Sequence, residues 1–131
     1  MPITALYAGL LAPVFMFLAF RVIAVRKDAR VAIGDGGNSE LLRRMRVHAN
    51  FAEYAPLSLL LIGLAESLGT SRFLLHALGA ALLAARVVHA FGVSRTPEKL
   101  ILRQAGMIGT FTVMGFAAAA CIVGALSRGV L

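Results

Sequence analysis

Four long apolar stretches dominate the sequence, and polar residues gather in the short segments between them. No charged residue occurs over residues 3–20 or 104–127. A helix needs roughly 20 mostly apolar residues to cross a bilayer, so the pattern predicts four membrane-spanning helices. They cover about residues 3–25, 44–67, 71–93 and 101–126. The second and third are less apolar, because the second begins with polar residues and Arg86 interrupts the third.

The predicted fold class is an all-α integral membrane protein, a single domain over residues 1–131. The connections are short, and short connections make consecutive helices antiparallel, so we expect an antiparallel four-helix bundle. A soluble four-helix bundle is the alternative. It requires a polar stripe on every helix, and the first and fourth stretches have none.

Composition strengthens the membrane prediction, and the placement of charge gives it an orientation. The chain is 60% hydrophobic and 15% charged, yet its net charge is +7. Ten of the 13 Lys and Arg residues lie in or beside the first and third connections, against Arg72 and Arg128 on the opposite side. Because short basic loops stay in the cytoplasm, we expect a cytosolic loop over residues 27–42 and both termini outside the cytoplasm. The apolar start has no basic region before it, which favours an uncleaved span over a signal peptide.

This placement also accounts for the basic charge without nucleic acid. The basic residues flank apolar spans, with no accompanying recognition element or exposed aromatic surface of the kind that nucleic-acid-binding proteins use. We therefore expect a lipid bilayer as the partner and no nucleic acid. The single cysteine, Cys121, lies inside an apolar span without metal-ligand spacing, so no metal site is predicted.

Turn residues mark the expected helix ends. Asn38 or Ser39 is suited to cap the second helix, and Ser71 to cap the third after a tight turn at residues 69–71. The segment 96–98, Thr-Pro-Glu, is expected to open the fourth helix, because proline is favoured in the first turn.

One group of polar residues lies near the start of the second span. Arg46, Asn50 and Glu53 follow i, i+4, i+7 spacing and therefore share one helix face; His48 and Tyr54 lie in the same segment. Ionisable residues at membrane depth are costly and often mark a site. An Arg–Asn–Glu network that orders the helices, an arginine that reaches to the interface, and a ligand site all remain open.

A second group, Arg86 with His89, shares a face of the third span. Glu53 lies at a similar depth and is the expected structural partner of Arg86. Together with Arg26, Arg46 and Arg103, Arg86 is expected to ring the cytoplasmic mouth of the bundle around this one acid. Arginine suits carboxylates and phosphates through its rigid donor fork. The surplus of cations predicts a small polyanionic ligand bound from the cytosolic side.

Residues 46–57, RVHANFAEYAPL, resemble the second-helix signature of the MAPEG family, the membrane-associated proteins in eicosanoid and glutathione metabolism. The family pattern is R-x-(H/Q)-x-N-x-x-E, often followed by Tyr and Pro. Similarity extends to the four spans, the basic first loop and the pair Ala85-Arg86, and the loop 34–38 (GDGGN) is similar to that of bacterial members. The resemblance implies a homotrimer in a bacterial inner membrane, with glutathione bound between subunits as the cosubstrate of a transferase or peroxidase. An apolar electrophile or lipid peroxide would enter from the bilayer.

The resemblance also implies residue roles. Glu53 would receive the amino group of glutathione, and arginines would hold its two carboxylates. The implied glutathione-binding residues are Arg26, Arg46, His48, Asn50, Glu53, Tyr54, Arg86 and His89. Arg103 is the best match to the arginine that stabilises the thiolate, although this match needs an alignment shift across residues 97–99. Val93 departs from relatives that carry a second tyrosine at that position.

Three other functions compete with a glutathione enzyme. A MAPEG-fold protein without glutathione chemistry, either lipid-binding or structural, is the main alternative. A small multidrug transporter would need an acid in the first span, and residues 3–20 contain none. A b-type haem protein would need His48 and His89 to face one cavity.

Overall fold

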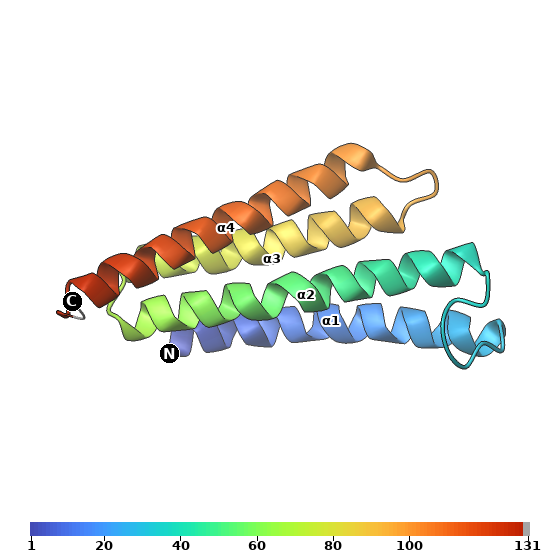
Figure 1. Ribbon diagram of the computed structural model, residues 1–131, viewed down its shortest axis with the longest axis horizontal. Coiled ribbons are helices and arrows are strands. Elements are labelled where there is room, and N and C mark those ends of the chain that lie inside the picture. Colours follow the sequence, from blue (N-terminus) through green and yellow to red (C-terminus); the bar gives the residue numbers. More distant parts are fainter. Residues whose placement is uncertain (130–131) are drawn as a thin grey trace.

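The computed structural model describes residues 1–129, which form four α-helices and no strand. They are α1 (Pro2–Asp28), α2 (Ser39–Ser67), α3 (Arg72–Ser94) and α4 (Leu100–Leu126) (Figure 1). All four are long and apolar enough to cross a membrane. The prediction of an all-helical chain with four such helices is thereby confirmed.

Capping side chains set two of the helix starts. Asn38 Oδ1 accepts a hydrogen bond from the Leu41 amide at 2.9 Å, and Ser71 Oγ accepts one from the Leu74 amide at 3.4 Å. Because Asn38 caps α2, this helix starts at Ser39, and the first connection is residues 29–38, shorter than the expected loop 27–42.

The start of the fourth helix was predicted wrongly. Residues 96–98 belong to the connection, and α4 begins at Leu100. The Lys99 amide donates a hydrogen bond to the Gly92 carbonyl at 3.1 Å. This bond ties the connection back to the last turn of α3 and delays the helix until Leu100.

The helices form two antiparallel hairpins, α1–α2 and α3–α4 (Figure 1). Helices α2 and α3 contact each other and both outer helices, whereas α1 and α4 make no contact with each other over the described residues. The hairpins diverge toward the end that carries connections 29–38 and 95–99 (Figure 1). Met1, the end of α4 and the turn at residues 68–71 lie at the opposite end.

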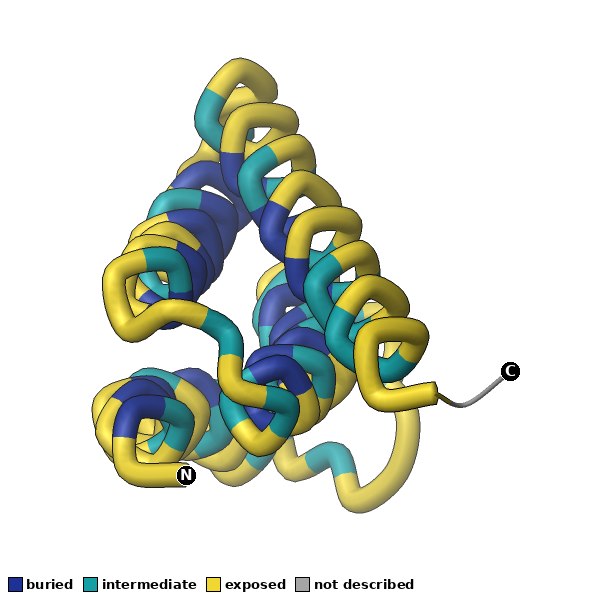
Figure 2. Tube along the Cα trace, turned by 90° about the vertical axis from the view of Figure 1, so that its left-hand side faces the viewer, coloured by how far each residue is buried: buried dark blue, intermediate teal, exposed yellow. Residues whose placement is uncertain are grey.

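Apolar residues are distributed as in a membrane protein. The buried residues face the interior of the bundle, and the outward surface is largely exposed (Figure 2). Large apolar side chains stand on that outward surface, among them Phe17, Phe20, Phe73 and Phe116, each at least 60% exposed. A water-soluble monomer rarely exposes so much apolar surface, so a lipid bilayer is the environment that the four helices imply.

At the terminal end, Glu66 caps the first turn of α1. Its Oε1 accepts from the Ile3 amide at 3.0 Å, and its Oε2 accepts from the Thr4 amide at 2.8 Å and the Thr4 hydroxyl at 2.6 Å. The first amides of a helix have no partner within it, and a carboxylate also suits the positive end of the helix dipole. Glu66 therefore has a structural role far from the divergent end.

Candidate functional site

A polar cavity of about 420 Å³ opens between α2, α3 and α4 at the divergent end. Four of the predicted site residues line it: Arg46, Asn50, His89 and Arg103. The other lining residues are Ser39, Leu42, Arg43, Val93 and Glu98. Three arginines and one acid give the walls a surplus of positive charge.

Two glycines bring α3 and α4 close enough to form this cavity. A Cβ atom at Gly92 would lie 2.6 Å from the Arg103 amide nitrogen, and one at Gly106 would lie 2.5 Å from the Cβ of His89. Any other residue at these positions would push the helices apart. The glycines therefore place Arg103 and His89 side by side on the same wall.

The arginines of the cavity differ in how they are held. Arg43 Nη1 donates to the carbonyls of Val93 and Arg95 at 3.3 and 3.4 Å, at the end of α3. Arg103 Nη1 lies 3.0 Å from Glu98 Oε1 in a partly exposed ion pair. Arg46 is exposed and has no hydrogen bond or ion pair with any residue from 1 to 129. Arg46 is thus free to bind an anion, and Arg103 can do so by releasing Glu98.

Arg86 lies behind the cavity and is 1% exposed. Its Nη1 donates to the Asn50 carbonyl at 3.4 Å, its Nη2 lies 3.9 Å from Met107 Sδ, and its Nε has no partner among the described residues. Its Cζ lies 5.9 Å from the centre of the Tyr54 ring. A buried guanidinium without a carboxylate partner is costly. Oδ1 of the neighbouring Asn50 is also buried and has no hydrogen-bond partner within residues 1–129.

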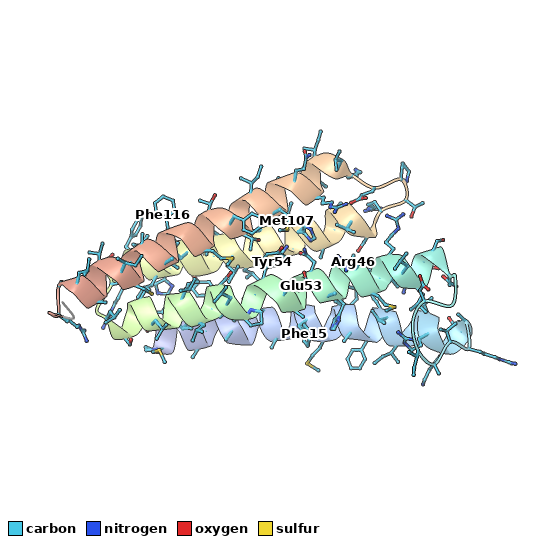
Figure 3. The ribbon with its side chains drawn as sticks, in the orientation of Figure 1. Phe15, Arg46, Glu53, Tyr54, Met107 and Phe116 are labelled. Atoms are coloured by element: carbon cyan, nitrogen blue, oxygen red, sulfur yellow. The ribbon has the colours of Figure 1, made fainter. Side chains whose placement is uncertain are left out.

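The expected pair between Arg86 and Glu53 does not form. Glu53 is exposed and has no ion pair within the described residues. Glu53 and Tyr54 are neighbours on α2 (Figure 3), but the Tyr54 ring and the Asn50 carbonyl are the groups that lie beside Arg86. The Arg–Asn–Glu network is also absent there, because the Asn50 amide reaches Met107 Sδ at 3.7 Å instead.

Arg26 and His48 lie away from this cavity, so the arginines do not form the expected single ring. Arg26 Nη1 donates to the carbonyls of residues 31, 32 and 34 at 3.0–3.2 Å and so holds the first connection. The His48 ring packs on Phe15 of α1, with ring centres 4.6 Å apart, and its Nε2 is buried with no hydrogen-bond partner in the described part of the chain. His48 and His89 therefore face different spaces, which removes the geometric basis for a haem site.

The predicted residues thus form two groups on different faces of α2. Arg46, Asn50, His89 and Arg103 line the cavity, with Arg86 and Tyr54 behind it. Arg26 and His48 lie on the α1 side. Sequence reasoning missed Met107, whose sulfur touches both Asn50 and Arg86. The available signal was its position four residues after Arg103, on the same face of one helix.

Comparison with known proteins identifies the class to which this fold and site belong. The MAPEG family profile matches residues 4–123. The chain is 37% identical to the inner membrane protein YecN of Escherichia coli K12 over 112 residues. This aligned region covers 86% of this chain and 84% of YecN. YecN of E. coli O6:H1 gives the same values. The chain belongs to the MAPEG family and is a four-helix membrane protein.

Proposed function

We propose that this protein binds glutathione and uses it in a transferase or peroxidase reaction on an apolar electrophile or lipid peroxide. The observation that carries the proposal is the exposed carboxylate of Glu53. It lies nine residues, about 14 Å, inside the predicted second span. A carboxylate facing lipid at such depth costs about 3 kcal/mol or more. An ammonium group, such as the amino group of glutathione, would compensate this charge.

The cationic cavity is suited to the carboxylates of glutathione, as Glu53 is to its ammonium group. Glutathione carries two carboxylates beside its one ammonium, and the cavity walls offer Arg46 and Arg103 with only Glu98 opposing them. Its volume of about 420 Å³ falls within the range of about 300–1,000 Å³ that is usual for small-ligand sites. Arg86 and Asn50 would complete their hydrogen bonding with ligand oxygens and amides.

The two faces of α2 support a site shared between chains. Glu53 and His48 lie on different faces of α2, and the His48 ring packs on Phe15 of α1, while Arg26 holds the first connection. Bound between neighbouring copies, the ligand would meet Glu53 of one and His48 and Arg26 of the next. This arrangement fits the homotrimer that the family resemblance implies, and it would cover Glu53 from lipid.

Arg103 is the proposed catalytic residue. A thiol has a pKa of about 8.5, and a nearby cation favours the more nucleophilic thiolate. In the transferase reaction the thiol releases its proton to water, and the thiolate sulfur attacks an electrophilic carbon to form a thioether. With an aryl chloride the carbon–chlorine bond breaks and chloride leaves with its electron pair. Arg103 would stabilise the sulfur's charge through its position, without transferring a proton. Glu98 would have to leave Arg103 when the thiolate arrives.

We also propose a location and an orientation. The similarity to YecN, an inner membrane protein, favours the bacterial inner membrane. The connections 29–38 and 95–99, with their Lys and Arg residues, would face the cytoplasm and both termini the other side. The polar cavity would then open toward cytosolic glutathione, while apolar substrates would approach from the bilayer.

Direct binding of glutathione to the purified, detergent-solubilised protein tests the proposal. We expect millimolar glutathione to raise the unfolding temperature, because a ligand that binds only the folded state stabilises it. Glu53→Gln should abolish the rise by removing the charge that holds the ammonium. Glu40→Gln, which removes the same negative charge at an exposed position of the same helix, should retain it. No rise for the unchanged protein would contradict the proposal.

The alternative, a MAPEG-fold protein without glutathione chemistry, has one observation in its favour. Arg103 is engaged by Glu98 at 3.0 Å, and Val93 supplies no hydroxyl to the cavity. Turnover with a chromogenic aryl chloride separates the two. Binding without conjugation or peroxide reduction would leave Arg103 without its proposed role.

Mixed assemblies test the shared site. Glu53→Gln and His48→Ala should each inactivate, yet co-expression of the two variants should restore part of the activity. One interface in a mixed trimer combines an intact Glu53 with an intact His48. Activity that stays at the level of the separate variants would place the whole site within one chain.

A further inference from the structure

A second, larger cavity of about 650 Å³ lies between α1 and α3. No residue of α4 lines it. Its walls are mainly apolar. Phe17 and Leu18 form the α1 side, and Val87, Ala90 and Phe91 form the α3 side. None of the proposed glutathione-binding residues lines it. The cavity is therefore a groove separate from the polar site.

The groove has a cationic end. Arg21 of α1 and Arg95 after α3 line it, and no acid does. Arg21 Nη1 donates to Ser94 Oγ at 2.8 Å, and the Arg95 guanidinium lies 4.3 Å from the centre of the Phe91 ring. Both arginines are thus held at the groove, and neither forms an ion pair with a carboxylate of residues 1–129.

A smaller cavity of about 330 Å³ continues from this end. It shares Arg21 and Ser94 with the groove and adds Arg43 and Arg44 to the lining. Glu40, the acid of this cavity, forms an ion pair with Arg44. The uncompensated charge at the shared end is therefore positive.

The dimensions suit an amphiphile. The groove follows α1 from Pro13 to Arg21 and α3 from Val87 to Ser94, with Arg95 just beyond the helix end. Eight residues of helix span about 12 Å. Arg21 lies seven residues before the end of α1 at Asp28. A headgroup at Arg21 would thus lie near the interface, and a chain attached to it would run toward the membrane interior.

We propose that this groove binds an anionic phospholipid. The phosphate would lie between Arg21 and Arg95, whose donor forks match phosphate oxygens, and one acyl chain would follow Phe17 and Phe91. A zwitterionic lipid fits less well, because its ammonium would meet Arg21, Arg95 and the nearby Arg43. The inference stands on the α1–α3 groove alone and does not require glutathione binding.

Tryptophan fluorescence offers a direct test, because the chain contains no tryptophan. Phe91→Trp places a single reporter on the groove wall, and Phe116→Trp places one on the outward face of α4, where Phe116 is 60% exposed. Each variant is reconstituted in phosphatidylcholine vesicles with increasing fractions of brominated phosphatidylglycerol or brominated phosphatidylcholine, which quench on contact. We expect brominated phosphatidylglycerol to half-quench Phe91→Trp at a lipid fraction about tenfold or more below that needed with brominated phosphatidylcholine. Each basic residue near an anionic headgroup raises the affinity about fivefold. Phe116→Trp should show no preference.

The arginines are then tested in the Phe91→Trp background. Arg21→Gln with Arg95→Gln should remove the preference, whereas Lys27→Gln with Lys99→Gln, the same loss of charge at the same end of the bundle, should keep it. Arg95→Gln alone changes an exposed residue and should reduce the preference about fivefold, which keeps the test decisive if Arg21→Gln disturbs folding. Equal quenching by the two lipids, or a preference that survives loss of both arginines, would overturn the proposal. So would preferential quenching by brominated oleate over phosphatidylglycerol, because it would identify a fatty acid as the occupant.

Discussion

Replacing Gly106 with alanine should separate α3 from α4 where the polar cavity is built. The new Cβ would lie 2.5 Å from the Cβ of His89, 2.6 Å from the His89 amide nitrogen and 2.7 Å from the Ala85 carbonyl oxygen. None of these atoms belongs to the end of a flexible side chain. Because carbon atoms pack at about 3.5–4.0 Å, α4 must retreat from α3 by about 1 Å.

The expected cost follows from this displacement. Overpacking a close-packed interior destabilises by about 1–3 kcal/mol, and alanine recovers up to about 1 kcal/mol of helix propensity relative to glycine. We expect a net loss of about 1–2 kcal/mol in the free energy of unfolding. Arg103 lies one turn before Gly106, so the retreat also moves its guanidinium, and turnover should fall at least about tenfold.

Thermal unfolding in detergent measures the first effect and conjugation kinetics the second. The matched control is Gly115→Ala on the same helix, because a Cβ at Gly115 meets no atom within 4 Å. The control should keep its stability or gain up to about 1 kcal/mol. If Gly106→Ala and Gly115→Ala unfold at the same temperature, the close packing does not position the site in the way that we describe.

Three further substitutions probe the charges at the divergent end. Arg86→Met should raise the unfolding temperature, because burial of a single uncompensated ion costs on the order of several kcal/mol. Calorimetry should show weaker glutathione binding, and an unfolding temperature that falls would contradict this expectation. Glu98→Gln should change the free energy of unfolding by less than about 0.5 kcal/mol, because the Glu98–Arg103 ion pair is partly exposed. The substitution should also accelerate conjugation by freeing Arg103, and an unchanged rate would show that Glu98 does not compete with the thiolate. Arg26→Gln should speed limited proteolysis between α1 and α2, because three carbonyls lose their donor, and equal cleavage rates would refute this role.

The helices were predictable because membrane solvation imposes a strong pattern on sequence. Long runs without charge admit few alternatives, and Asn38 and Ser71 mark two helix starts through local capping bonds. The failure at residues 96–98 has a nonlocal cause. The hydrogen bond from Lys99 to Gly92 joins two helices, and no pattern within the connection indicates it.

The candidate site was predictable as a set of residues but not as an arrangement, and the difference comes from the rotation of α2. Helical spacing correctly relates Arg46 to Asn50, which line one cavity. It cannot reveal that the Asn50 carbonyl and the Tyr54 ring take the place beside Arg86 and leave Glu53 outside. The buried cation and the exposed anion are thus kept apart within one chain, and neither has an ion-pair partner among residues 1–129. A zwitterionic ligand at the contact between two copies would supply both partners. The absence of the Arg86–Glu53 pair therefore supports a binding site shared between chains, whereas a formed pair would have left neither charge in need of a ligand.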